Sequence, residues 1–240
     1  MAPRFSFSAG RAAAGHDEGL EPSRRSGFSF RRAQATPEDA EAKEPGQRAT
    51  LLFVCTGNVC RSAYGHHVLE ALLAQRLGPD LAGLQVASAG TGINQALQPP
   101  DQILGLAAAR CPEAVAPLTE HRPHALTAAD VDGAVLVLAA TDQHLDVVLD
   151  EQPGAARRAF TVLEFARLCA AVLDEGLAGG EGVAGLVRQC AELRERAGGR
   201  AEDLADPFRR SDAEYEAMAE RLQPALEAIT EAVARAVRDG

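Results

Sequence analysis

Short apolar runs alternate with amphipathic segments along the chain from Thr50 onward. Four of these runs have the length and composition of strands covered on both faces, at 51–54, 84–88, 135–138 and 160–162. Helical periodicity marks the segments 62–77, 101–110, 142–149, 164–173 and 212–237. Because strands that alternate with helices form parallel sheets through right-handed crossovers, we expect an α/β fold. The prediction is a four-stranded, parallel, doubly wound sheet with helices on both faces.

Two stretches depart from this alternation. Residues 1–49 show no hydrophobic period and predict a disordered N-terminal tail ahead of a domain at 50–240. The tail contains the repeat Phe-Ser-Phe at 5–7 and again at 28–30, either by chance or as a short peptide for a tail-mediated protein contact. Residues 176–203 are rich in glycine around a charged helical middle, and we interpret them as an insertion in the domain.

Charge and composition narrow the class of protein. The 24 basic and 34 acidic residues give a net charge of −10, which argues against general binding to nucleic acid or to an anionic membrane. The longest apolar run, Ala134–Ala140, is far too short to cross a bilayer, and the first 30 residues hold no apolar stretch of signal-peptide length. We therefore expect a cytoplasmic protein. The five cysteines have no zinc-site spacing, so neither a metal nor another cofactor is expected.

The most informative segment joins the first strand to the first helix. Cys55 ends the strand, and Arg61 follows six residues later at the start of the helix. A loop of this kind turns several backbone N–H groups toward one point, where they and the helix dipole bind an anion. The same field favours the thiolate of Cys55, and the planar fork of Arg61 can grip two phosphate oxygens. The residues that would bind phosphate or support the loop are Thr56, Gly57, Asn58, Val59, Cys60 and Ser62.

The sequence Val-Cys-x-Gly-Asn-x-Cys-Arg-Ser at 54–62 closely resembles the phosphate loop of the low-molecular-weight protein tyrosine phosphatases. Ser-Ala-Gly-Thr at 88–91 is similar to that family's second-strand motif. Asp-Pro-Phe at 206–208 resembles its Asp-Pro-aromatic loop and stands before the last predicted helix. The resemblance runs from about Thr50 to the C-terminus, interrupted by the predicted insertion. A second Cys-x5-Arg, Cys190 to Arg196, lacks the strand and the glycine, and we interpret it as chance.

The resemblance implies a mechanism without a metal. Cys55 would attack phosphorus and form a phosphocysteine, while Arg61 and the loop amides hold the phosphate oxygens. Asp206 would protonate the leaving phenolate and then activate the hydrolytic water. The family also implies that Cys60 can form a disulfide with Cys55 on oxidation; the alternative is a small core residue.

The sequence also departs from the family pattern. After Arg-Ser the family usually has Pro and, three residues later, Glu, where this chain has Ala63 and His66. In the loop after Ser-Ala-Gly-Thr, Ile93 stands in for the usual aromatic residues, and together with Phe208 it is the candidate for the substrate pocket. These departures do not affect the residues predicted to carry the chemistry. They weaken the prediction that phosphotyrosine is the preferred substrate. We expect His66 and His67 on the surface of their helix, and His144 in a capping or surface role.

The leading prediction is an enzyme that hydrolyses phosphotyrosine in protein substrates. Two alternatives remain open. An arsenate reductase on the same fold would need further cysteines to relay a disulfide, and Cys111, Cys169 and Cys190 include no closely spaced pair. A phosphate-binding pseudophosphatase or interaction module is the other, although Cys55, Arg61 and Asp206 are all retained.

Overall fold

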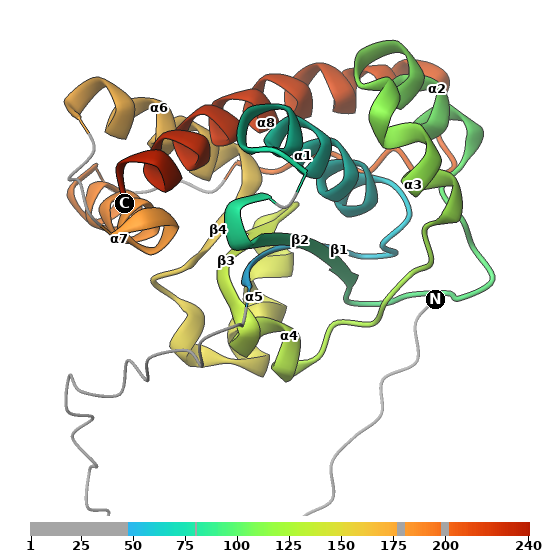
Figure 1. Ribbon diagram of the computed structural model, residues 1–240. Coiled ribbons are helices and arrows are strands. Elements are labelled where there is room, and N and C mark those ends of the chain that lie inside the picture. Colours follow the sequence, from blue (N-terminus) through green and yellow to red (C-terminus); the bar gives the residue numbers. More distant parts are fainter. Residues whose placement is uncertain (1–47, 80, 177–180, 198–201) are drawn as a thin grey trace, which may run out of the picture. The chain divides into compact units, whose positions relative to one another are not determined.

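The computed structural model describes residues 48–79, 81–176, 181–197 and 202–240. Its centre is a sheet of four parallel strands in the order β2-β1-β3-β4 (Figure 1). The strands are β1 (Ala49–Cys55), β2 (Leu84–Gly90), β3 (Ala134–Ala139) and β4 (Ala159–Thr161). The predicted doubly wound α/β fold is confirmed. The predicted tail lies outside the described residues except for its last two positions, and Ala49 already belongs to β1.

Eight helices are formed by the described residues. They are α1 (Arg61–Leu77), α2 (Asp101–Arg110), α3 (Val115–Glu120), α4 (Ala128–Gly133), α5 (Asp142–Glu151), α6 (Val162–Glu175), α7 (Gly182–Ala197) and α8 (Asp212–Asp239). The described residues also form three short 3-10 helices: η1 (Leu81–Gly83) before β2, η2 (Pro112–Ala114) between α2 and α3, and η3 (Pro153–Ala155) before β4. The helices α3 and α4 were not predicted, because six residues are too few to show a helical period.

Alternate residues of β1 face opposite sides of the sheet, as strand geometry requires. Leu51 and Phe53 enter the larger core, which is covered by α1, α6 and α8. Leu52 and Val54 enter the smaller core, which α4 and α5 cover (Figure 1). Burying each of these side chains contributes about 1.5–3 kcal/mol, so both faces hold β1 in place.

The long helix α8 closes the larger core. It begins with a capping box, in which the Ser211 hydroxyl and the Glu214 carboxylate each bind the other's backbone N–H. Tyr64 of α1 donates a hydrogen bond of 3.1 Å to the side-chain oxygen of Gln223 in α8. The helix α7 also packs on α8 and α6, with Leu186 and Cys190 buried. No helix among the described residues combines the length and the hydropathy of a membrane span.

The carboxyl end of β1 lies at the topological switch point of the sheet. Its neighbours β2 and β3 flank β1 on opposite sides, and parallel sheets bind ligands in the crevice at such a point. The predicted phosphate loop connects this end of β1 to the first turn of α1. Gly90, at the corresponding end of β2, has no room for a side chain, because a Cβ atom there would lie 2.5 Å from the carbonyl oxygen of Thr56.

Candidate active site

The thiol of Cys55 is buried at the start of α1. The backbone N–H of Asn58 donates to its Sγ atom at 3.3 Å. The hydroxyl of Ser62 lies 2.9 Å from the same sulfur. The Ser62 oxygen also accepts a hydrogen bond from Asn58 Nδ2 at 2.9 Å, which leaves its own proton for the sulfur. Two hydrogen-bond donors and a helix N-terminus therefore face the Cys55 sulfur.

Asn58 holds the loop in shape. Its backbone has a φ of 52°, in the left-handed region that asparagine tolerates better than most residues. Besides Ser62, its Nδ2 atom donates to Ser88 Oγ of β2 at 2.9 Å. Its Oδ1 atom accepts from the backbone N–H of His124 at 2.9 Å. The side chain is wholly buried, so these bonds fix the loop to β2 and to the segment before α4.

Arg61 reaches across the same pocket and is almost completely buried. One terminal nitrogen donates to the carbonyl oxygen of Leu204 at 3.1 Å. The other forms an ion pair with Asp206 Oδ2 at 2.8 Å and lies 3.4 Å from Thr56 Oγ1. Its Nε atom is buried and finds no hydrogen-bond partner among the described residues. A buried donor without a partner costs about 1–3 kcal/mol. An anion bound in the pocket could accept this hydrogen bond and recover that cost.

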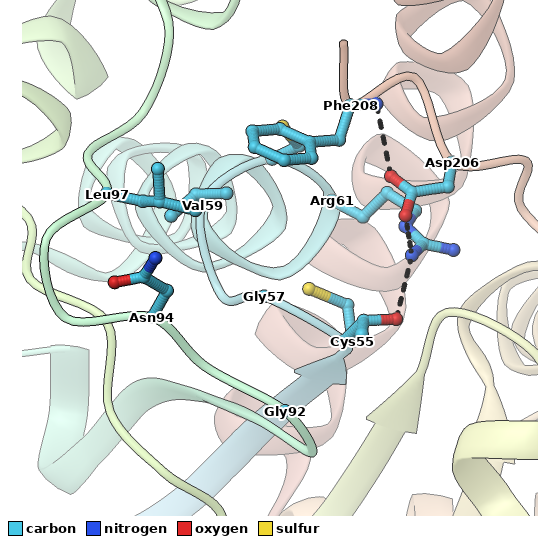
Figure 2. A pocket seen from close by; sticks show the side chains of 11 residues that line it. Cys55, Gly57, Val59, Arg61, Gly92, Asn94, Leu97, Asp206 and Phe208 are labelled. Atoms are coloured by element: carbon cyan, nitrogen blue, oxygen red, sulfur yellow. Dashed lines mark hydrogen bonds and ion pairs between the residues drawn. The ribbon is translucent and has the colours of Figure 1, made fainter.

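Asp206 lies at the mouth of the pocket, on the segment that leads to α8. Its side chain is 45% exposed. Its Oδ1 atom accepts a hydrogen bond of 3.2 Å from the backbone N–H of Phe208 (Figure 2). One carboxylate oxygen is thus held by its own loop and the other by Arg61.

The pocket between these groups has a volume of about 140 Å³. Figure 2 shows the Cys55 sulfur pointing into it, with Val59, Leu97 and Phe208 on the other side. The lining residues are Cys55, Thr56, Gly57, Val59, Cys60, Arg61, Gly92, Asn94, Leu97, Asp206 and Phe208.

The structure brings together most of the residues predicted for the site. Of the predicted loop residues, Asn58 and Ser62 lie behind the pocket and the others line it. Ile93 lies beside Gly90 and is not among the residues that line the pocket. The loop is fixed by hydrogen bonds of 2.9 Å from the N–H groups of residues 91 and 92 to the carbonyl oxygens of residues 55 and 56. With the loop so placed, Asn94 and Leu97 take the position expected for Ile93.

His144 is a supporting residue whose side-chain role the sequence did not reveal. The hydroxyl of Thr141 caps α5 and lies 2.6 Å from His144 Nδ1, and His144 Nε2 lies 2.9 Å from Thr56 Oγ1. The ring is buried rather than on the surface. Burial, together with the positive charge of Arg61, lowers the pKa of His144 to about 4, so the ring is neutral at pH 7. In the sequence, the available signal was that His144 stands three residues after Thr141 at the start of a helix. That position indicated a capping role but not the contact with Thr56.

Cys60 lies beside the nucleophile position but in a different environment. All five cysteines are free in the structure. Burial, and then the nearby Asp206 and Cys55, raise the pKa of Cys60 to about 12. Cys60 is therefore a neutral thiol at pH 7, which argues against it as the nucleophile. Its disulfide with Cys55 stays a prediction.

Comparison with known proteins agrees with this geometry. Residues 50–174 match the family model described as low molecular weight phosphotyrosine protein phosphatase. A protein-arginine-phosphatase of Geobacillus stearothermophilus is 31% identical over 115 residues, which are 48% of this chain and 70% of that protein.

Solved structures share the fold. A low molecular weight protein tyrosine phosphatase from T. tengcongensis is 23% identical, with a TM-score of 0.54 over 76% of this chain and 98% of the other. A mutant of YwlE from Bacillus subtilis is 22% identical, with a TM-score of 0.51 over 76% and 97%. Because the family model covers half of the sequence, the chain belongs to the low molecular weight phosphotyrosine protein phosphatase family and is a phosphatase.

Proposed function

We propose that the chain hydrolyses phosphotyrosine in protein substrates through a phosphocysteine on Cys55, without a metal ion. The observation that carries the proposal is the convergence of three groups on one pocket. The Cys55 sulfur faces two donors at a helix N-terminus, Arg61 presents an unpartnered Nε–H, and Asp206 stands at the mouth. Transfer of a phosphoryl group to sulfur requires three groups: a thiolate, hydrogen-bond donors that bind the phosphate oxygens, and an acid.

The reaction balances in two steps. The thiolate of Cys55 attacks phosphorus in line, and the bond to the leaving oxygen breaks as Asp206 donates its proton to that oxygen. Water then attacks phosphorus, Asp206 takes the proton from water, and the sulfur leaves as the thiolate. The donors on Arg61 and the loop amides stabilise the charge on the phosphoryl oxygens in both steps.

The Arg61–Asp206 ion pair has a role in this sequence. A bound phosphate competes with the Asp206 carboxylate for the same guanidinium nitrogen, which now lies 2.8 Å from Oδ2. Loss of that contact frees Asp206 to carry the proton that it takes from water in the second step and to turn toward the leaving-group oxygen. Since Asp206 is nearly half exposed and held otherwise by one backbone hydrogen bond, the movement costs little.

The lining of the pocket supports an aromatic leaving group. Val59, Leu97 and Phe208 offer apolar surface on which the ring of phosphotyrosine can pack. Phosphoarginine is the second candidate, because the relative from Geobacillus is a protein-arginine-phosphatase. Its guanidinium would need hydrogen-bond acceptors in place of apolar contacts, and in this pocket Asn94 and Asp206 are the side chains that offer them.

Two peptides of identical flanking sequence, one with phosphotyrosine and one with phosphoarginine, separate the candidates. We expect a higher kcat/KM for the phosphotyrosine peptide and no release of phosphate by Cys55→Ser. Phe208→Ala should lower kcat/KM for that peptide while leaving inhibition by inorganic phosphate unchanged, since the ring contacts the leaving group only. A higher kcat/KM for phosphoarginine would replace the proposed substrate. Binding of both peptides without release by the wild type would instead indicate a pseudophosphatase.

A further inference from the structure

Three histidines form a cluster behind the phosphate loop, outside the pocket. His66 and His67 belong to the second turn of α1, and His121 follows α3. The rings of His66 and His67 stack with centroids 4.1 Å apart, and His121 meets His67 edge-on at 5.1 Å. One nitrogen of each ring lies within 4.8 Å of the corresponding nitrogens of the others. The sequence predicted His66 and His67 on the surface, but His67 is buried and His66 is partly so.

The hydrogen bonds define which nitrogen of His121 carries a proton. Its Nε2 atom lies 2.9 Å from the carbonyl oxygen of Asn58, and a carbonyl only accepts, so Nε2 donates. In the neutral ring the lone pair is then on Nδ1, which faces His67 Nε2 at 3.0 Å. An imidazole that donates one N–H to a backbone carbonyl and directs the other nitrogen into a cluster has the arrangement of a metal-bound histidine.

His67 supplies a second, independent observation. Because Nε2 of His67 donates its proton to His121, the lone pair of the His67 ring is on Nδ1. That atom is buried and has no hydrogen-bond partner among the described residues. A buried acceptor without a partner costs about 1–3 kcal/mol, and few occur in folded proteins, so this one points to a ligand. Rotation of the ring or a change of tautomer brings this lone pair to a bound ion.

The surroundings of the cluster suit a cation. Glu70, one turn further along α1, places Oε2 3.8 Å from His66 Nε2 and 3.9 Å from His67 Nδ1. Its side chain is 42% exposed and free to turn inward.

We propose that His66, His67 and His121 bind a divalent transition-metal ion, zinc in the first place, with Glu70 as the fourth ligand. Imidazole nitrogens with one carboxylate in four-coordinate geometry are typical of zinc. The ion would replace the hydrogen bond between His67 and His121. Because zinc–nitrogen bonds of about 2.0–2.1 Å in a tetrahedron place the nitrogens roughly 3.3 Å apart, these two nitrogens, now 3.0 Å apart, would separate slightly, and the more distant nitrogens of the cluster would draw closer. Contact with the phosphate loop would persist, because His121 Nε2 still donates to the carbonyl of Asn58. The proposal is independent of the function of the pocket.

Cobalt absorption tests the site without reference to activity. The full chain with Cys55→Ser and Cys60→Ser, which removes the thiols of the pocket, is titrated with Co²⁺ and then with Zn²⁺. We expect one equivalent of Co²⁺ to give the visible bands of a tetrahedral site without sulfur-to-cobalt charge transfer, and Zn²⁺ to displace it. Absence of these bands, or bands with sulfur-to-cobalt charge transfer, would overturn the proposal.

Matched variants locate the ion. In that background, His66→Gln, His67→Gln and Glu70→Gln should each weaken Co²⁺ binding by at least about tenfold. His124→Gln is the control, because His124 is an exposed histidine that pairs with Asp130 outside the cluster. The affinity of this variant for Co²⁺ should match that of the parent. Glu70 and His66 reach the surface, so their variants should fold, which circular dichroism checks. Equal affinity in His66→Gln, Glu70→Gln and His124→Gln would overturn the assignment.

Discussion

In the proposed mechanism, the reactivity of Cys55 depends on the Ser62 hydroxyl that faces its sulfur. Ser62 accepts the side-chain N–H of Asn58, so its own O–H points to the Cys55 sulfur at 2.9 Å. The neighbouring thiol of Cys60 has no such environment, and its pKa is raised. The two cysteines, five positions apart, therefore have different surroundings.

Removing that hydroxyl should slow the enzyme. Ser62→Ala deprives the thiolate of a hydrogen bond, and hydrogen bonds to charged groups contribute about 1.5–3 kcal/mol. We expect turnover of para-nitrophenyl phosphate to fall by roughly 10- to 100-fold. Alkylation of Cys55 by iodoacetate at pH 6 should slow in parallel. Unchanged alkylation in Ser62→Ala would contradict this role, and faster labelling of Cys60 than of Cys55 in the wild type would contradict the choice of nucleophile.

Asp206→Asn tests the proposed acid. The amide cannot protonate the leaving group, so turnover of esters with poor leaving groups should fall by roughly 10²–10⁴-fold. The loss should shrink for esters whose leaving group needs no proton. Rates measured across a series of aryl phosphates check this dependence. A uniform loss along the series would point instead to lost binding.

At the scale of elements, the sequence predicted the path of the chain better than the contacts between distant segments. The strand before Cys55 and the helix after Arg61 carry local signals, and both were found with ends shifted by only a few residues. The displacement of Ile93 by Leu97 depends on hydrogen bonds between two loops. The burial of His67 depends on His121, 54 positions away. No period or motif in the sequence encodes such contacts.

The link between α5 and the phosphate loop should be visible in the pH dependence of stability. The pKa of His144 is about 4 in the folded chain and near 6.5 when unfolded. Between these values the unfolded state binds more protons, so the free energy of unfolding should decrease as the pH falls from about 6.5 to about 4. His144→Gln removes this contribution, so its deficit relative to the wild type should narrow over that range. Urea denaturation at pH 7 and pH 4.5 measures the change. A deficit that stays constant or widens would contradict a buried neutral ring.

At the scale of the whole molecule, the segment between α6 and α8 contributes to the core. The sequence predicts residues 176–203 to be an insertion, which stays a prediction. Within this segment, α7 buries Leu186 and Cys190 against the rest of the domain. We therefore propose that the segment stabilises the domain rather than forming a separate module.

Removing residues 1–47 should leave the fold and the turnover of a small aryl phosphate intact. The sequence motivates this expectation, since the segment lacks a hydrophobic period and β1 begins at Ala49. Residues 1–34 hold six arginines against three acidic residues, while the chain as a whole carries a charge of −10. If the tail docks on the domain, deletion should shift a contiguous patch of amide resonances, and the shifts should fade at high salt. Superimposable spectra at low salt would contradict docking.

The central claim is that phosphoryl transfer passes through Cys55 without a metal. The most direct test is to locate the phosphoryl group during turnover. Asp206→Asn, which should slow hydrolysis of the intermediate, is mixed with para-nitrophenyl phosphate in the presence of a metal chelator, quenched and analysed by peptide mass spectrometry. The account predicts one phosphoryl group on the peptide that contains Cys55, and none when Cys55→Ala is added. Phosphorylation of another residue would contradict it. So would release of nitrophenol by the single variant Cys55→Ala at the rate of the wild type.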